Sequence, residues 1–242
     1  MRKESIDKLF IETAKIIERL IDEREKAGGD KELKELLEVQ VKSALEHLRS
    51  ILDYSANDIF DKLQEIHTNS SSPIKKPKVY FPYTDKEAQF RSRVQGNLPK
   101  LETHLKAVYD LIHSMQPFLP DNKWLLDLCQ QNNAFKHDGL VPQSRHDFTS
   151  VTSPGIRIQK NNNLTMIGNV YNGQALPDVV IRNGISVIPL ESYPKEYSFK
   201  TGSDFKFKGT NIDIIDLLTT SYDRINEYVA ALYPMLGESK RL

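Results

Sequence analysis

The longest regular pattern in this chain is a stripe of mainly apolar residues that starts at Leu33 and ends at Leu63. No proline or glycine interrupts it, and its members recur every three or four positions: Leu33, Leu37, Val41, Leu45, Leu48, Leu52, Ser55, Ile59 and Leu63. This spacing predicts a single helix of about nine turns, with Asp30 as its N-cap. The N-terminal half of the chain is therefore expected to fold around one long amphipathic helix.

A second amphipathic helix is predicted before this one. Between Ile6 and Ile21 the apolar residues follow the same 3.6-residue repeat, which stops at Gly28 and Gly29. Two long helices joined by a Gly-Gly turn are expected to form an antiparallel hairpin.

Two further helices are predicted after a loop rich in serine and proline at residues 67–78 and a short extended piece, VYFPY. The third helix ends at Gln116 and Pro117, and its apolar residues are Leu98, Leu101, Leu105, Val108, Ile112 and Met115. Asp121 would cap a fourth helix, which carries Trp124, Leu125, Leu128 and Cys129. Four amphipathic helices indicate a bundle.

The pattern changes after Pro142, where polar and apolar residues begin to alternate. Alternation predicts strands, which we place in GIRIQK, NLTMIGNVYNGQ, DVVIRNGISVIPL and EYSFKTGSDFKFKG. The pairs Asn172-Gly173 and Asn183-Gly184 favour tight hairpin turns, so we expect an antiparallel sheet of about four to six strands.

Helical spacing returns between Ile214 and Leu232 and predicts a last helix that packs on the bundle. The predicted fold class is therefore α+β. We expect a helical bundle over residues 1–145, an antiparallel β subdomain over 146–209, and a C-terminal helix over 210–242 that returns to the bundle.

The composition limits the classes of partner. The chain has 242 residues with 33 basic and 33 acidic side chains, so no overall charge attracts it to nucleic acid or to an anionic membrane. No run approaches the roughly 20 apolar residues of a membrane span. The single cysteine, Cys129, is typical of a small core residue in a reducing compartment. We therefore expect a soluble cytoplasmic protein with no membrane partner.

Polar residues accompany the apolar stripe of the long helix on one flank: Glu46, Arg49, Ser50, Asp53 and Asn57. Weak salt bridges on a solvated face would explain them. Alternatively, Arg49 and Asp53 face the end of the fourth helix, where Asn132, Asn133, Lys136 and His137 follow one another closely. The cluster would then supply amides, a cation and a titratable imidazole for binding a phosphate or moving a proton.

The same residues have a structural interpretation. Lysine and histidine at a helix C-terminus interact favourably with its dipole and its last carbonyl groups, and asparagine tolerates the left-handed conformation of a helix cap. Helix capping by Asn132, Asn133, Lys136 and His137 therefore stays open beside the binding hypothesis.

A basic segment with interleaved aromatic residues lies between the two polar groups. Residues 75–106 contain eight lysines and arginines, and also Tyr80, Phe81, Tyr83 and Phe90. Phosphate contacts combined with base stacking would need this composition, and so would a loop whose aromatic rings cover the core. His104 and His113 have no nearby ligand partners, and no phosphate loop or metal motif occurs, so we expect no metal and no cofactor.

Three stretches together resemble a family of uncharacterised, mostly bacterial and phage-borne proteins. They are VKSALEHLRSILDY, YFPY and IHSMQPFLPDNKWLLDLCQQNNAFKH. The matching residues are Leu48, Arg49, Ser50, Leu52, Asp53, Tyr54, Phe81, Pro82, Gln116, Pro117, Asn133, Lys136 and His137. This chain has Asp138 where the family has an arginine after Lys-His, and Glu46 or His47 where the family has an asparagine.

More distantly, a helical bundle with polar residues on two inner helices is similar to the HEPN superfamily. Many members of that superfamily are metal-independent RNases of toxin–antitoxin and phage-defence systems. Those nucleases carry an arginine, then four to six intervening residues, then a histidine, a spacing that this chain lacks. Asn132 stands at the nearest equivalent position before His137.

Two functions from different classes follow from these observations. The first and preferred one is a non-catalytic binding or regulatory protein, of a phage-defence or mobile-element system, that holds a nucleotide or RNA. The second is an RNase with His137 as general acid or base and Lys136 or Arg49 stabilising the phosphate. The apolar stripes of the long helices also permit a homodimer.

Overall fold

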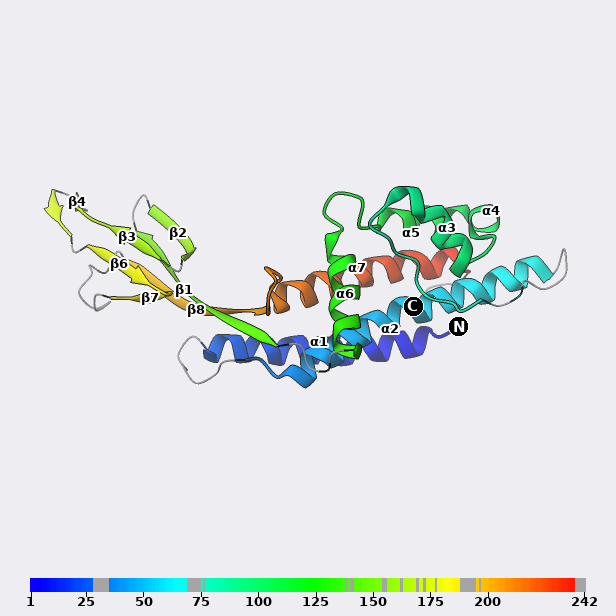
Figure 1. Cartoon of the computed structure of the whole chain (residues 1–242), viewed down its shortest axis with the longest axis horizontal. Coiled ribbons are helices and arrows are strands. Elements are labelled where there is room, and N and C mark those ends of the chain that lie inside the picture. Colours follow the sequence, from blue (N-terminus) through cyan, green and yellow to red (C-terminus); the bar gives the residue numbers. More distant parts are fainter. Residues whose placement is uncertain are drawn as a thin grey trace. The chain divides into compact units, whose positions relative to one another are not determined.

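The computed structural model of the chain describes residues 1–27, 35–68, 75, 77–137, 139, 142–153, 156–161, 163–168, 170–171, 173–176, 178–187, 195 and 197–237. Within these ranges the fold is α+β, as predicted, with seven helices and eight strands (Figure 1). The chain forms two compact units. The first contains Met1–Glu18, Val39–Leu140 and Ile215–Leu242, and the second contains Arg19–Glu38 and Val141–Ile214. The predicted division placed its boundaries after residues 145 and 209 instead.

The first unit contains the larger part of α1 (Lys3–Ala27), up to Glu18, and α2 (Glu38–Thr68) from Val39 onward. The backbone N–H of Arg2 donates to Oδ2 of Asp58 at 2.7 Å, near the end of α2, whereas Thr13 Oγ1 lies 3.4 Å from Nδ1 of His47, nearer its start. The two helices therefore run in opposite directions, which confirms the predicted hairpin. Its Gly-Gly turn and the predicted Asp30 cap lie outside the described residues.

The long helix begins later than its apolar stripe suggested. Gln143 binds both backbone groups of Leu36: its Oε1 accepts from the Leu36 N–H at 3.0 Å, and its Nε2 donates to the Leu36 carbonyl at 3.1 Å. The N–H of Leu37 donates to Glu23. These partners bind backbone groups of residues that precede the helix, which begins at Glu38. Leu36 is buried, whereas Leu37, which was expected on the buried stripe, is 45% exposed.

The predicted third helix was wrong in its extent, since two helices, α4 (Leu101–His104) and α5 (Lys106–Ser114), occupy its region. A further helix, α3 (Glu87–Asn97), precedes them and was not predicted. Pro99 disfavours helical backbone at the residue before it, and Leu98 accordingly has φ −132 and ψ 68. Lys100 then adopts a left-handed φ of 69. Leu105 (φ −135, ψ 60) separates α4 from α5, and no local sequence signal marks this break.

The fourth predicted helix is α6 (Lys123–His137). It begins directly after Asn122, whereas Asp121 has a left-handed φ of 65. Asp121 is therefore not the residue next to the helix, and its predicted role as N-cap was wrong.

The C-terminal helix α7 (Ile214–Met235) packs on α1 and α2, as predicted. The rings of Phe10 and Tyr222 meet edge to face with their centres 5.3 Å apart. Further along, Tyr233 donates its hydroxyl to Asp58 of α2 at 2.7 Å. Among the helices in the described ranges, none is both long enough and apolar enough to cross a membrane.

The strands of the second unit form three antiparallel sheets rather than the single sheet that was predicted. The first has the order β2 (Ile156–Asn161), β1 (Gln143–Ser153), β8 (Ser198–Phe207). The second has the order β3 (Leu164–Met166), β6 (Val179–Arg182), β7 (Ile185–Ser186), and the third pairs β4 (Val170–Tyr171) with β5 (Gln174–Ala175). The central strand β1 was missed because its sequence, QSRHDFTSVTS, contains few apolar residues.

The predicted turn at Asn183-Gly184 joins paired strands and shows why glycine is needed there, whereas Asn172 of the other predicted turn lies outside the described residues. Asn183 and Gly184 between β6 and β7 have φ values of 49 and 78, which match the hairpin turn that Asn-Gly favours. A Cβ on Gly184 would lie 2.2 Å from the backbone carbonyl of Asp147 in β1. The glycine thus lets the turn of the second sheet approach the first sheet closely.

Candidate functional site

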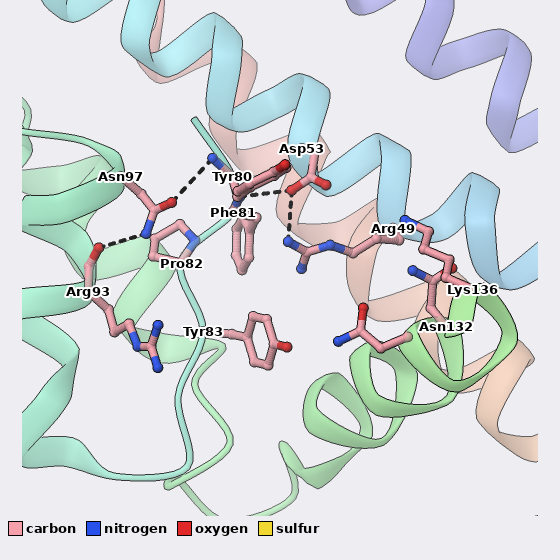
Figure 2. Close-up of a pocket in the computed structure, with 11 residues that line it drawn as sticks. Arg49, Asp53, Tyr80, Phe81, Pro82, Tyr83, Arg93, Asn97, Asn132 and Lys136 are labelled. Atoms are coloured by element: carbon pink, nitrogen blue, oxygen red, sulfur yellow. Dashed lines mark hydrogen bonds and ion pairs between the residues drawn. The ribbon is translucent and has the colours of Figure 1, made fainter. Parts of the chain in front are cut away.

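A pocket of about 310 Å³ in the first unit is enclosed by α2, α3, α6 and the extended segment of residues 80–83 (Figure 2). The helices α2, α3 and α6 contribute charged and amide side chains, and the extended segment contributes aromatic rings. The lining residues are Arg49, Asp53, Tyr80, Phe81, Pro82, Tyr83, Arg93, Asn97, Asn132, Asn133 and Lys136.

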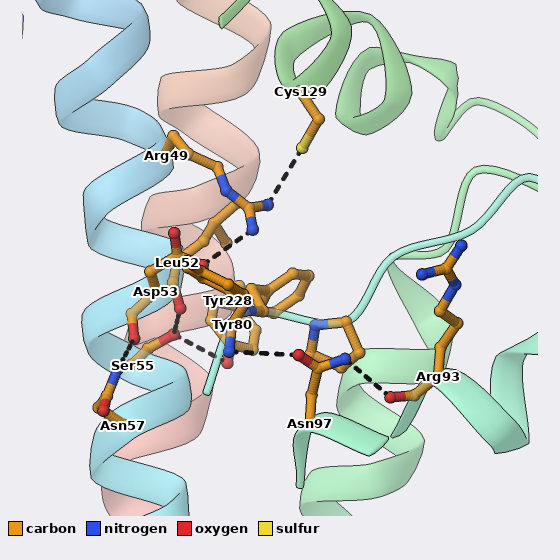
Figure 3. Close-up of polar contacts among 12 residues, drawn as sticks. Arg49, Leu52, Asp53, Ser55, Asn57, Tyr80, Arg93, Asn97, Cys129 and Tyr228 are labelled. Carbon is orange, nitrogen blue, oxygen red and sulfur yellow. Dashed lines mark hydrogen bonds and ion pairs between the residues drawn. The ribbon is translucent and has the colours of Figure 1, made fainter. Parts of the chain in front are cut away.

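Arg49 is held at the pocket wall by three contacts, and Figure 3 shows those with Asp53 and Cys129. Its Nη2 donates to Oδ1 of Asp53 at 2.9 Å, one helical turn away, and its Nη1 donates to Sγ of Cys129 in α6 at 3.2 Å. Its guanidinium carbon lies 5.3 Å from the centre of the Tyr83 ring. Because the Arg49 side chain is only 12% exposed, this pair is not the solvated surface salt bridge that the sequence also allowed.

Burial changes the acid–base properties of this group of side chains. It raises the pKa of Asp53, although Arg49, the N–H of Phe81 and the charge of Lys136 each act in the opposite direction. Burial also raises the pKa of the Cys129 thiol, so sulfur accepts its hydrogen bond from Arg49 as a neutral group. Burial by itself would lower the pKa of Arg49, but its neighbours raise it overall, and Arg49 is a permanent cation.

The extended segment that crosses the pocket is held by side chains rather than by a neighbouring strand. Asn97 Oδ1 accepts a hydrogen bond from the N–H of Tyr80 at 3.3 Å, and Asp53 Oδ1 accepts one from the N–H of Phe81 at 2.9 Å. The Phe81 ring is buried edge to face against Tyr228 of α7, with ring centres 5.5 Å apart. Asp53 therefore orients both Arg49 and the segment opposite it.

The next residues of the segment are fixed by Gln116, whose side chain is completely buried. Its Nε2 donates to the carbonyl of Pro82 at 3.1 Å, and its Oε1 accepts from the N–H of Thr84 at 3.1 Å. Pro82 has no N–H and needs no partner for one. Tyr83, which lies between these two anchored residues, is thereby positioned beside Arg49.

Several polar groups of the pocket remain available to a ligand. Asn132 is 1% exposed, and its Oδ1 is buried without a hydrogen-bond partner in the described part of the chain. Asp53 uses Oδ1 for both of its hydrogen bonds, which leaves Oδ2 as an acceptor. Arg93 and Lys136 are exposed and form no ion pair within the described ranges. Because a buried acceptor without a partner is costly, the pocket is suited to a ligand that donates a hydrogen bond to Asn132.

Five of the six residues predicted to bind a ligand line this one pocket: Arg49, Asp53, Asn132, Asn133 and Lys136. Their helices meet where Arg49 contacts Cys129. The sixth, His137, is the last residue of α6, and its side chain lies outside the described part of the structure. The catalytic roles suggested for His137, Lys136 and Arg49 stay predictions.

The sequence allowed two interpretations of the basic aromatic segment: its rings cover the core, or its side chains form a binding surface. The structure contains residues of each kind. Phe81 is buried and also borders the pocket, and Tyr80, Tyr83 and Arg93 line the pocket as well. Asn97 is the lining residue that sequence reasoning missed. It stands at the end of a helix before Leu98-Pro99, a local signal for helix termination that says nothing of its bond to Tyr80.

Comparison of the chain with protein-family models, with curated proteins and with solved structures finds no match. The resemblances drawn from the sequence motifs therefore stay predictions. In the ranges that the structure describes, no group of three or more histidine, cysteine, aspartate or glutamate residues is placed to hold a metal ion. The kind of ligand that the pocket can bind is therefore inferred from the residues that line it.

Proposed function

We propose that this chain is a non-catalytic binding protein whose pocket holds a nucleotide, either free or as a unit of RNA. One observation carries the proposal: the cations Arg49, Arg93 and Lys136 come from three helices and line one pocket with a single carboxylate, Asp53. An excess of positive charge in a concave site favours anions, and guanidinium and ammonium groups are the usual partners of phosphate.

The cations occupy different parts of the pocket. Lys136 and Arg49 lie at one end, Arg93 lies at the other, and Tyr83 lies between them (Figure 2). Arg49 has five N–H groups, of which Asp53 and Cys129 use one each. Lys136 and Arg49 can therefore share one phosphate group, with Arg49 already held in place.

The middle of the pocket suits the nucleoside part of the ligand. Oδ2 of Asp53 and Oδ1 of Asn132 are acceptors, as the hydroxyl groups of a ribose or the amino group of a base require. Tyr80 is 42% exposed and offers an aromatic surface, and stacking of a base on such a ring contributes about 1–3 kcal/mol. A simple anion would use the cations but leave these acceptors unpaired.

The proposal is tested with the variant Lys136→Ala. We expect it to bind the four ribonucleoside 5′-monophosphates about tenfold more weakly than the unmodified protein, because it loses one charge-assisted hydrogen bond to phosphate. Isothermal titration calorimetry measures the change. Lys123→Ala is the matched control, since Lys123 belongs to the same helix and pairs with Asp127 outside the pocket, and its affinity should stay within about twofold.

Equal weakening by both lysine substitutions would mean that general surface charge, rather than the pocket, attracts the nucleotide. Binding of inorganic phosphate as tight as that of the nucleotides would show that the acceptors and the tyrosines play no part.

The RNase alternative depends on His137, and the sequence lacks the arginine that HEPN nucleases place ahead of their histidine with four to six residues between them. We therefore expect the purified protein to leave mixed cellular RNA intact over hours, as judged by gel electrophoresis. Cleavage that disappears in both His137→Ala and Arg49→Ala, while circular dichroism shows that both variants stay folded, would establish the enzyme instead.

A further inference from the structure

A second cavity adjoins the pocket on α3. It has a volume of about 550 Å³ and is lined by Gln89, Ser92, Arg93, Gly96 and Asn97. Arg93 and Asn97 also line the first pocket. Arg93 and Asn97 therefore form a junction that borders both cavities, and a ligand that occupies both would have to pass these two side chains.

The two residues at the junction differ in their hydrogen bonding and in their charge. Asn97 is fixed through both ends of its amide, since Oδ1 accepts from the N–H of Tyr80 and Nδ2 donates to the carbonyl of Arg93 at 2.9 Å. The Arg93 guanidinium is exposed and forms no ion pair with any residue that the structure describes. The junction thus combines a rigid wall with an unpaired cation, which suits a phosphate that joins two sugars.

At Gly96 no side chain covers the backbone of α3 where the helix lines the second cavity. Its φ is not positive, and a Cβ added there would meet no atom within 4 Å. Glycine in a helix is less stable than alanine, and neither backbone conformation nor packing in the described structure requires it here. Close approach of a ligand to the helix backbone is a remaining reason for glycine at this position.

We infer that the ligand is a segment of single-stranded nucleic acid at least two nucleotides long. This inference rests on the proposed function and extends it. One nucleotide occupies the first pocket, with a phosphate at Lys136; the phosphate that links it to the next nucleotide contacts Arg93; and the next nucleotide lies over Gly96. A single strand is required because a base in the first pocket must be unstacked to reach Tyr80 or Tyr83.

The inference is tested by comparing ligands of different length on the unmodified protein. Binding of a fluorescein-labelled random RNA tetranucleotide is measured by anisotropy, and the four ribonucleoside 5′-monophosphates and an unlabelled RNA duplex compete with it. We expect the tetranucleotide to bind about tenfold more tightly than any mononucleotide, since it adds a charge-assisted contact at Arg93. The duplex should compete about tenfold more weakly than the single strand, because its bases are paired and stacked.

The variant Gly96→Leu places a side chain in the second cavity, and Gln95→Leu makes the same change one residue away, outside both cavities. Gly96→Leu should reduce tetranucleotide affinity to the level of a mononucleotide and leave mononucleotide affinity unchanged. Gln95→Leu should change neither affinity. Both variants should unfold at the temperature of the unmodified protein or above it.

Three results would overturn the inference while the proposed function stands: mononucleotides that bind as tightly as the tetranucleotide, a duplex that competes equally well, or a Gly96→Leu variant with full tetranucleotide affinity. If neither mononucleotides nor the tetranucleotide bind, the proposed function fails together with the inference.

Discussion

Replacement of Asp58 by alanine is expected to lower the free energy of unfolding by about 3–5 kcal/mol, the usual cost of removing one member of a buried charged network. Asp58 is 1% exposed. It accepts hydrogen bonds from the backbone and the guanidinium of Arg2 and from the hydroxyl of Tyr233. The substitution would remove the carboxylate that joins α2 to Arg2 and to Tyr233 of α7, together with its three hydrogen bonds.

Urea denaturation measures this loss, and Asp61→Ala provides the matched control. Asp61 pairs with the same Arg2 guanidinium, but its side chain is 52% exposed, so its removal should cost at most about 1 kcal/mol. Tyr233→Phe should fall between the two, at about 1–2 kcal/mol. Similar losses for Asp58→Ala and Asp61→Ala would show that burial of the network does not stabilise the first unit.

Replacement of Arg49 by alanine should affect both stability and binding. We expect nucleotide affinity to fall about a hundredfold, because the variant loses a fixed cation and frees the Tyr83 ring that it covers. The free energy of unfolding should fall by about 2 kcal/mol. This is less than for a fully buried pair, because the Asp53 side chain is 22% exposed. Calorimetric titration and urea denaturation of the same preparation measure the two effects.

Arg91→Ala is the control for this substitution, since Arg91 is 80% exposed and pairs with Glu102 away from the pocket. It should change neither quantity appreciably. Arg49→Lys should restore little of the affinity, because an ammonium group cannot reproduce the fork that contacts Asp53 and Cys129 together. If the Arg49→Ala variant bound the nucleotide with full affinity, Arg49 would not contribute to nucleotide binding.

The elements that could be predicted from the sequence are those with strong local signals. The 3.6-residue repeat identified α1, α2, α6 and α7, and the Asn183-Gly184 pair identified a hairpin turn that the backbone angles confirm. In each case the residues that carry the sequence signal belong to the element that they predict.

Two of the elements that were predicted wrongly, the start of α2 and the strand β1, depend on partners elsewhere in the chain. The start of α2 is set by Gln143, which lies 107 residues from Leu36 and binds both of its backbone groups. The strand β1 carries few apolar residues, and it is a strand because it pairs with β2 and β8 on its two sides. No local pattern contains this information.

The residues of the candidate site also divide into those with a local sequence signal and those that depend on a distant partner. Arg49 and Asp53 were selected because they lie one helical turn apart beside a buried stripe, and Lys136 because it ends an apolar helix; these are local patterns. Asn97 could not be found in this way, because its role depends on the N–H of Tyr80, 17 residues away. The geometry of the pocket is thus observed, whereas its ligand is a proposal.

The most direct test of the account is a crystal structure of the protein with a ribonucleoside 5′-monophosphate bound at saturating concentration. The account predicts the nucleotide in the pocket between α2, α3 and α6, with phosphate oxygens within hydrogen-bond distance of Lys136 or Arg49 and a donor group of the nucleoside at Oδ1 of Asn132. A nucleotide bound elsewhere, or a pocket that holds only water at that concentration, would contradict it.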